Sequence, residues 1–179
     1  PDRVQHFGSL YSSVGEKMDL TGLSKNSQVA PMLVRLYDSH KLYALAKDDK
    51  PLARSELSGA ICELLDSARN EREGELIADI LVSLIRQAEK DFKEALSERL
   101  SSMDNVPLRL ALHLANDEIQ VAEPMLSRSS VLGDLDLIYI IKSKDSEYWR
   151  AIAKRESMSD QLVSVLADTR DNATVQILL

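Results

Sequence analysis

The sequence contains little of what breaks helices or builds an aromatic core. Of its 179 residues, 6 are glycine, 5 are proline and 8 are aromatic. Glycine and proline therefore occur at about half their usual frequency, which favours helices throughout the chain. Neither GxGxxG nor GxxxxGK(S/T) occurs, and glycine is too sparse for a loop that cradles phosphate. The sequence thus predicts an all-α protein without a nucleotide cofactor.

Cysteine and histidine are equally scarce. Cys62 is the only cysteine, so neither an intramolecular disulfide nor a thiolate cage for zinc can form, and we expect a reducing compartment. It follows Ile61 at the edge of an apolar stripe, where a packed thiol is expected rather than a nucleophile. His6, His40 and His113 are scattered and HExxH is absent. We therefore expect no metal, no other cofactor and no catalytic residue.

The charges are predominantly acidic. The chain has 22 Lys and Arg against 29 Asp and Glu, a formal charge of -7. Residues 1–86 contain 11 cations and 13 anions, and residues 87–179 contain 11 and 16. This balance disfavours nucleic acid and anionic membranes as partners. The most apolar run, residues 76–85, is too short for a membrane span. With no signal peptide in view, we expect a cytoplasmic location.

The first fifty residues predict a helical region of their own. Apolar residues recur there at steps of three and four, the seam of an amphipathic helix. The members of this seam are Val4, Phe7, Tyr11, Val14 and Met18. A polar loop over residues 21–27 and a helix over 29–45 follow. The seam needs cover, either by folding back on the first repeat or by pairing with another chain as a homodimer.

Residues 51–86 predict two further helices. Pro51 suits the first turn of a helix that presents an apolar face up to residue 68. Residues 70–73 then form a charged turn, in which we expect Glu71, Glu73 and Glu75 to be a solvated cap. The following segment, residues 76–85, has the widest apolar stripe of the chain, so it is predicted to be the most buried element.

A pattern recurs three times in the second half of the chain. In each copy, apolar residues stand 7, 4 and 3 positions before an arginine. The copies are Phe92, Ala95, Leu96 and Arg99; Val121, Pro124, Met125 and Arg128; and Tyr148, Ala151, Ile152 and Arg155. The arginines are 29 and 27 residues apart. The sequence therefore has a repeat with a period of roughly 28 residues.

Each copy is followed by a second apolar segment. These segments are Val106, Leu110 and Leu114; Leu135, Ile138 and Ile141; and Leu162, Val165 and Leu166. Each unit is thus predicted to be two short helices, stable only when stacked on its neighbours. A fourth unit begins at Val175, and its arginine would fall near position 182. We expect the stack to continue beyond the sequence given.

Aspartates stand at the junctions between units. Asp117, Asp145 and Asp171 each precede a predicted helix, where a short acceptor side chain can cap free backbone N–H groups. Gln120, three residues after Asp117, completes a predicted capping box. We therefore expect all three aspartates to be N-caps.

Several segments resemble a known family. The run from about residue 55 to 179, with EALSERL at 94–100, LALHLAND at 110–117 and VAEPMLSRS at 121–129, resembles an uncharacterised alphaproteobacterial family of HEAT-like helical repeat proteins. This resemblance implies a short right-handed α-solenoid with no assigned activity, catalytic residue or cofactor. We accordingly divide the chain into an N-terminal helical region, 1–50, and a HEAT-like repeat domain, 51–179.

Two kinds of residue are candidates for function. Arg99, Arg128 and Arg155 form either a ladder that ties units together or a row of anion-binding groups. Trp149 points about 100° away from the apolar position of Tyr148, so both cannot be in the core. Trp149 is then either a contact for a protein partner or a cover for the neighbouring unit.

Three functions are compatible with this pattern. We favour a non-enzymatic module or scaffold whose concave surface or leading helix binds another protein. A HEAT-like nucleic-acid-binding protein or DNA glycosylase is the alternative, although its surface should be basic. A HEAT-like lyase for a prosthetic group is a third, against which stand the few aromatics and the lack of a suitable cysteine.

Overall fold

The structure of the chain, a computed structural model, describes residues 51–67, 70–86 and 88–179. Within these ranges the chain forms nine helices and no strand, which confirms the all-α prediction for the described residues. The chain divides into two compact units, Pro1–Glu89 and Lys90–Leu179, whereas the predicted domain boundary follows residue 50. The predicted seam of residues 4–18, the loop and the helix over 29–45 lie outside the described residues, so homodimerisation through the seam stays a prediction.

In the first unit, α4 (Pro51–Ser67) packs against α5 (Glu71–Arg86). Pro51 is the first residue of α4, as its missing N–H allows. Asn70 precedes α5, and its side-chain oxygen accepts a hydrogen bond from the backbone N–H of Glu73 at 2.9 Å. The apolar stripe of residues 76–85 is buried along the whole length of α5, as predicted.

The three glutamates at the start of α5 do not form a solvated cap. Glu71 and Glu75 are exposed, but Glu73 is completely buried. Glu73 stands three and four residues before Leu76 and Ile77, so the helical period places it on the buried face. The prediction of an exposed cluster was wrong for this residue, because the helix starts earlier than the charged turn suggested.

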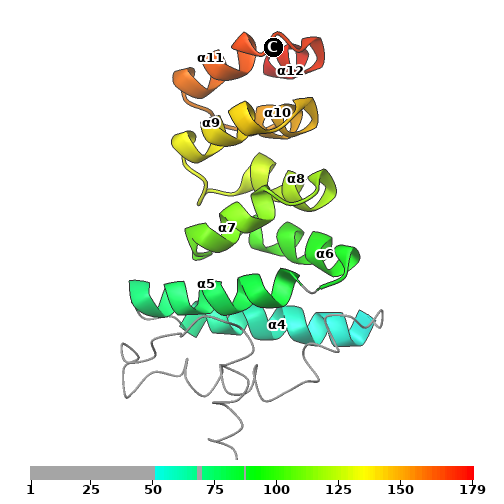
Figure 1. Cartoon of the computed structure of the whole chain (residues 1–179), viewed down its shortest axis with the longest axis vertical. Helices are drawn as coiled ribbons and strands as arrows, with labels where there is room; N and C mark the ends of the chain where they lie inside the picture. Colours follow the sequence, from blue (N-terminus) through cyan, green and yellow to red (C-terminus); the bar gives the residue numbers. More distant parts are fainter. Residues whose placement is uncertain (1–50, 68–69, 87) are drawn as a thin grey trace, which may run out of the picture. The chain divides into compact units, whose positions relative to one another are not determined.

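In the second unit the helices form two layers. One layer contains α6 (Lys90–Leu100), α8 (Ile119–Arg128), α10 (Ser146–Ala153) and α12 (Asn172–Leu178), each packed against the next. The other contains α7 (Leu108–Ala115), α9 (Asp134–Ser143) and α11 (Asp160–Asp168), of which α7 also packs against α8 and α9 against α11. Figure 1 shows the layers as two columns of short helices.

The core of the second unit lies between these layers. Leu96, Met125 and Ile152 are fully buried, as the recurring pattern predicted. The second apolar segments are mostly buried, with one clear exception, because 78% of Leu135 is exposed. Leu135, Ile138 and Ile141 are three positions apart, and three residues turn an α-helix by about 300°, which is less than a full turn. The shortfall accumulates over the two steps, so Leu135 lies far from Ile141 around the axis of α9. The prediction was wrong there because the buried face of α9 follows Leu137 and Ile141 instead.

Two of the three predicted N-caps are observed. Asp145 accepts a hydrogen bond from the N–H of Glu147 and caps α10, and Asp171 accepts one from the N–H of Thr174 and caps α12. Asp117 is not a cap, because the N-cap residue of α8 is Glu118, which makes no side-chain cap bond. The capping box with Gln120 was therefore wrong, and the Asp117 carboxylate has other partners.

We predict very different costs for shortening two leucines of α7. Leu114 is fully buried, so Leu114→Ala should lower the free energy of unfolding by about 2–5 kcal/mol through lost burial and a residual cavity. Leu108 is 45% exposed, so Leu108→Ala should change it by only about 0.5 kcal/mol. Urea unfolding of the full chain measures both values, and equal costs would contradict the observed orientation of α7.

Candidate functional site

The loop between α7 and α8 is held from the α6 side through Asp117. The Nζ of Lys93 donates to the two carboxylate oxygens of Asp117 at 3.0 and 3.3 Å. The N–H of Glu118 donates to the same carboxylate at 2.7 Å. Both side chains of the ion pair are mostly buried. This pairing explains why Asp117 does not cap α8.

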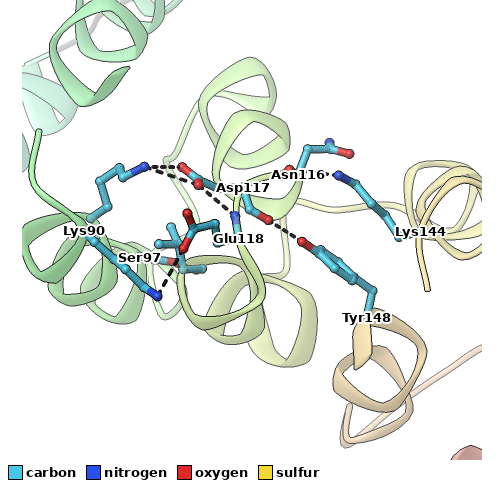
Figure 2. A network of polar contacts seen from close by, with 9 residues as sticks. Lys90, Ser97, Asn116, Asp117, Glu118, Lys144 and Tyr148 are labelled. Atoms are coloured by element: carbon cyan, nitrogen blue, oxygen red, sulfur yellow. Dashed lines mark hydrogen bonds and ion pairs between the residues drawn. The ribbon is translucent and has the colours of Figure 1, made fainter. Parts of the chain in front are cut away.

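The same loop is held from the α10 side by two donors. The hydroxyl of Tyr148 donates to the backbone carbonyl of Asp117 at 2.6 Å, and Nζ of Lys144 donates to the carbonyl of Asn116 at 3.1 Å. Figure 2 shows how Lys144 and Tyr148 approach the loop from one side and the side chains of α6 from the other. Burial, followed by the nearby carboxylate of Asp145, raises the pKa of Tyr148, so its phenol remains a hydrogen-bond donor. The loop therefore joins three consecutive helices of one layer.

Further contacts link neighbouring helices of that layer. The buried hydroxyl of Ser97 donates to the carbonyl of Val121, which connects α6 to α8. Exposed ion pairs also link successive helices of this layer. They are Lys90–Glu118, Glu98–Arg128 and Glu123–Lys154. Exposed pairs of this kind stabilise by about 1 kcal/mol or less each. The buried hydroxyl is therefore the more stabilising link.

The three recurring arginines lie at or just beyond the ends of α6, α8 and α10. Arg155 donates to the carbonyls of Leu126 and Ser129 at the end of α8, so it reaches back to the preceding helix of its layer. Burial lowers the pKa of Arg155, but a guanidinium stays charged in proteins. Arg128, half exposed, forms an ion pair with Glu98 at 2.6 Å. Arg99 is exposed in the last turn of α6.

Trp149 uses its indole N–H within the chain. Nε1 donates to the carbonyl of Ile141 at 2.8 Å and to that of Lys144 at 3.0 Å. These carbonyls belong to the end of α9, where backbone acceptors lack helical partners. The ring is half-buried, so its proposed contact with a protein partner stays a prediction.

A second charged junction lies between α10 and α12. The guanidinium of Arg150 donates to both oxygens of Asp171, at 3.1 and 3.2 Å. The hydrogen bonds from Arg150, and then those from Thr174, lower the pKa of Asp171 to about 2. This carboxylate is therefore ionised at all but very acidic pH.

The outer face of the α7, α9 and α11 layer carries exposed apolar side chains. Leu135 and Tyr139, one turn apart on α9, are 78% and 71% exposed. On α7, Leu108 is 45% exposed and Leu112, one turn later, is half-buried. Sequence reasoning missed this surface because it assigned Leu135 to the core and gave no role to Tyr139. The sequence signal for this surface was a pair of apolar residues, four positions apart, at the start of α7 and again at the start of α9.

The described residues offer little that could hold a cofactor. In the part of the chain that the structure describes, no group of three or more His, Cys, Asp or Glu residues is placed to bind a metal ion. Cys62 is buried, as predicted, and His113 is half-buried on α7. His6 and His40 lie outside the described residues. Over the same ranges, no helix is long and apolar enough to cross a membrane.

Comparison with known proteins assigns part of the chain. Residues 121–179, about a third of the sequence, match a family described as an uncharacterised protein conserved in bacteria (DUF2336). The matched part starts in the first turn of α8 and continues through α12, so this part of the chain is similar to a bacterial domain of unknown function. Searches of curated proteins and of solved structures found no match to the chain.

We predict that the hydroxyl of Tyr148 stabilises the fold. Tyr148→Phe should lower the free energy of unfolding by about 0.5–1.5 kcal/mol, because the Asp117 carbonyl loses its donor. Tyr139→Phe, which alters an exposed hydroxyl on α9, should change it by less than about 0.5 kcal/mol. Chemical denaturation of the full chain compares the two variants. Equal stability of both would refute the hydrogen bond as a link between α10 and the loop.

Two of the recurring arginines should differ in their effect on stability. Arg155→Met removes a charged donor from two carbonyls at the end of α8 and should cost about 1.5–3 kcal/mol. Arg128→Met breaks only a half-exposed ion pair and should cost about 1 kcal/mol or less. Thermal and urea unfolding give both numbers. A larger loss of stability in Arg128→Met than in Arg155→Met would contradict the stronger role given to Arg155.

The pair of Arg150 and Asp171 should make stability depend on acid pH. The folded pKa of Asp171, about 2, lies below its unfolded value of about 3.9, so the stabilisation is complete above about pH 4 and is lost as pH falls through about 2. Asp171→Asn should therefore have a lower Tm than the original chain at pH 7, and the difference should narrow below pH 4. Asp168→Asn, an exposed change at the end of α11, is the control. A Tm difference unchanged down to pH 2 would show that the carboxylate charge is unimportant.

Proposed function

We propose that this chain is a non-enzymatic protein-binding module of a bacterial cytoplasm, built as a short right-handed α-solenoid of HEAT-like hairpins. The outer face of α7 and α9 is the proposed contact surface. The observation that carries this function is the exposure of Leu135 and Tyr139 on a helix whose opposite side is buried in the core. Exposed apolar side chains that gather on one face are typical of protein contact sites.

The repeat is supported by the correspondence between α7 and α9. Positions 27 residues apart in α7 and α9 correspond. The buried residues of α7, Leu110, Ala111 and Leu114, correspond to Leu137, Ile138 and Ile141 of α9, which are also buried. By the same shift of 27 positions, the outward Leu108 and Leu112 of α7 correspond to Leu135 and Tyr139 of α9. Inward and outward positions thus correspond in both helices, as expected of repeats that stack with little rotation.

The third helix of the layer marks the limit of the apolar surface. The buried Leu162 and Leu166 of α11 correspond to the buried Leu137 and Ile141 of α9 at a shift of 25. The outward positions of α11 are then Asp160 and Ser164, both polar and exposed. The apolar face is therefore confined to α7 and α9, which is the pattern of a specific contact rather than of a generally apolar surface.

The use of the polar side chains supports a non-enzymatic role. In the polar cluster around Asp117, the side-chain donors form hydrogen bonds to backbone carbonyls, and the carboxylate forms an ion pair with Lys93. Arg155 and Trp149 likewise serve carbonyls at helix ends. Groups used in this way hold helices together. The second unit also has 15 Asp and Glu against 11 Lys and Arg, which disfavours the alternative of a nucleic-acid-binding protein or glycosylase.

A site-specific photo-crosslink tests this function. Benzoylphenylalanine replaces Tyr139 in the full chain, which is then irradiated in an extract of the source bacterium. We expect one predominant protein adduct, formed through the benzophenone at position 139. The matched control carries the same group at Gln161, an exposed position on the polar outer face of α11. Mass spectrometry identifies the adducts.

A second substitution separates specific binding from general stickiness. Adding Leu135→Asp to the crosslinking chain should abolish the adduct, because it places a charge in the contact surface without disturbing the core. The proposal fails if positions 139 and 161 capture the same proteins, if position 139 captures none, or if the adduct survives Leu135→Asp.

A further inference from the structure

We infer that the outer face of α7 and α9 binds an amphipathic helix of a partner protein, with the cationic end of that helix at the N-terminal ends of α7 and α9. This inference rests on the proposed function and specifies the chemistry of the partner. It is carried by the outward side chains of the two helices, by the hydrogen bonds that link the ends of α7 to those of α9, and by the charges at one end of the pair.

Hydrogen bonds link the two ends of α7 to the corresponding ends of α9. Before the helices, the hydroxyl of Ser130 donates to the carboxylate of Asp104 at 2.7 Å. After them, Lys144 donates to the carbonyl of Asn116 at 3.1 Å. Because like ends are joined to like ends, the two helices run parallel. Figure 1 shows them in adjacent positions of the same layer.

This arrangement produces two parallel rows of apolar side chains. Leu108 and Leu112 form one row on α7, and Leu135 and Tyr139 form the other on α9, each with a spacing of one turn. A helix with apolar residues at a spacing of three and four can place its stripe along the seam between such rows. Tyr139 adds a large, rigid contact of the kind that dominates binding energy at protein interfaces.

The size of the surface favours a single helix over a second copy of this chain. The exposed parts of Leu108, Leu135 and Tyr139 add to about two whole side chains, or about 400 Å² at roughly 200 Å² each. A stable dimer typically needs about 800 Å² from each partner, of which about 60%, or about 500 Å², is apolar. The apolar surface is therefore too small for a stable homodimer by itself, whereas it matches two or three turns of one helix.

The charges select the direction of the partner helix. Asp104 stands in the turn before α7, and Asp134 and Asp136 are in the first turn of α9. Asp160 is the first residue of α11, which packs against α9. Arg109 in the first turn of α7 and the half-buried Arg155, whose charge interacts with that of Asp134, are cations at this end, so the four carboxylates outnumber them two to one. Complementary charge steers association and fixes orientation, which places a Lys- or Arg-rich end of the partner at this edge.

A display selection on the full chain tests the inference directly. The probe is a library of twenty-residue helical peptides with randomised surface positions, selected on the immobilised chain and depleted on the variant Leu135→Ser/Tyr139→Ser. We expect enriched peptides with apolar residues spaced by three and four and with Lys or Arg clustered at one end. For each peptide, titration calorimetry then gives the Kd.

Three variants define the expected affinities. Leu135→Ser/Tyr139→Ser should weaken binding at least about 100-fold, since it removes two central contacts. Asp134→Asn/Asp160→Asn should weaken it about three- to tenfold, and this loss should shrink at high salt. Ser164→Ala, on the polar face of α11, should leave the Kd unchanged. Circular dichroism should show the same helix content in all three variants, because every changed side chain is exposed.

The outcomes separate the inference from the proposed function. Peptides that depend on Leu135 and Tyr139 but lack a cationic end, or bind equally well to Asp134→Asn/Asp160→Asn, would overturn the inferred chemistry and leave protein binding intact. Peptides that bind the serine variant equally well, or no enriched peptides at all, would overturn both. A chain that sediments as a dimer and becomes monomeric in Leu135→Ser/Tyr139→Ser would overturn the inference in favour of a second copy as the occupant.

Discussion

The structure of the second unit depends on mutual cover between helices that are too short to stand alone. Its helices have 7 to 11 residues, and isolated helices of that length are marginal in water. Each gains stability by burying an apolar face against its neighbours, as Met125 does at the middle of its layer. The fully buried Leu96 and Ile152 belong to the helices on either side. Removing one of these helices would uncover the next, so the unit is stable only as a stack.

Short helices also leave many backbone groups without partners, and the polar side chains of this chain are used mainly for those groups. Arg155 and Trp149 donate to carbonyls at the ends of α8 and α9, and Tyr148 and Lys144 donate to the loop after α7. Asp171 accepts from the N-terminus of α12. Because most of these bonds join different helices, they also fix how consecutive helices sit on each other. The outward apolar side chains of α7 and α9 can then keep a defined spacing, as a contact surface requires.

The sequence predicts most of what depends on local period, and it fails where the period is ambiguous or where contacts between distant residues decide. The helices, the burial of Leu96 and Met125, and the caps Asp145 and Asp171 follow from patterns within about ten residues. Asp117 has the same local pattern but pairs with Lys93, 24 positions away, and this partner is invisible in the local sequence. Leu135 was misplaced because a spacing of 3 and 3 drifts around a helix. The bonds of Arg155 to α8 could not be predicted without the three-dimensional arrangement, although the recurring sequence pattern marked Arg155 as a residue of interest.

Native-state hydrogen exchange of the full chain tests most directly whether the helices depend on one another. Met125 is fully buried in α8, which packs against both α6 and α10. Met125→Ala should cost about 2–5 kcal/mol and should lower the protection of amide groups in α6 and α10 as well as in α8. Mutual cover predicts this loss in all three helices. Loss of protection confined to α8, with α6 and α10 protected as in the original chain, would contradict the account.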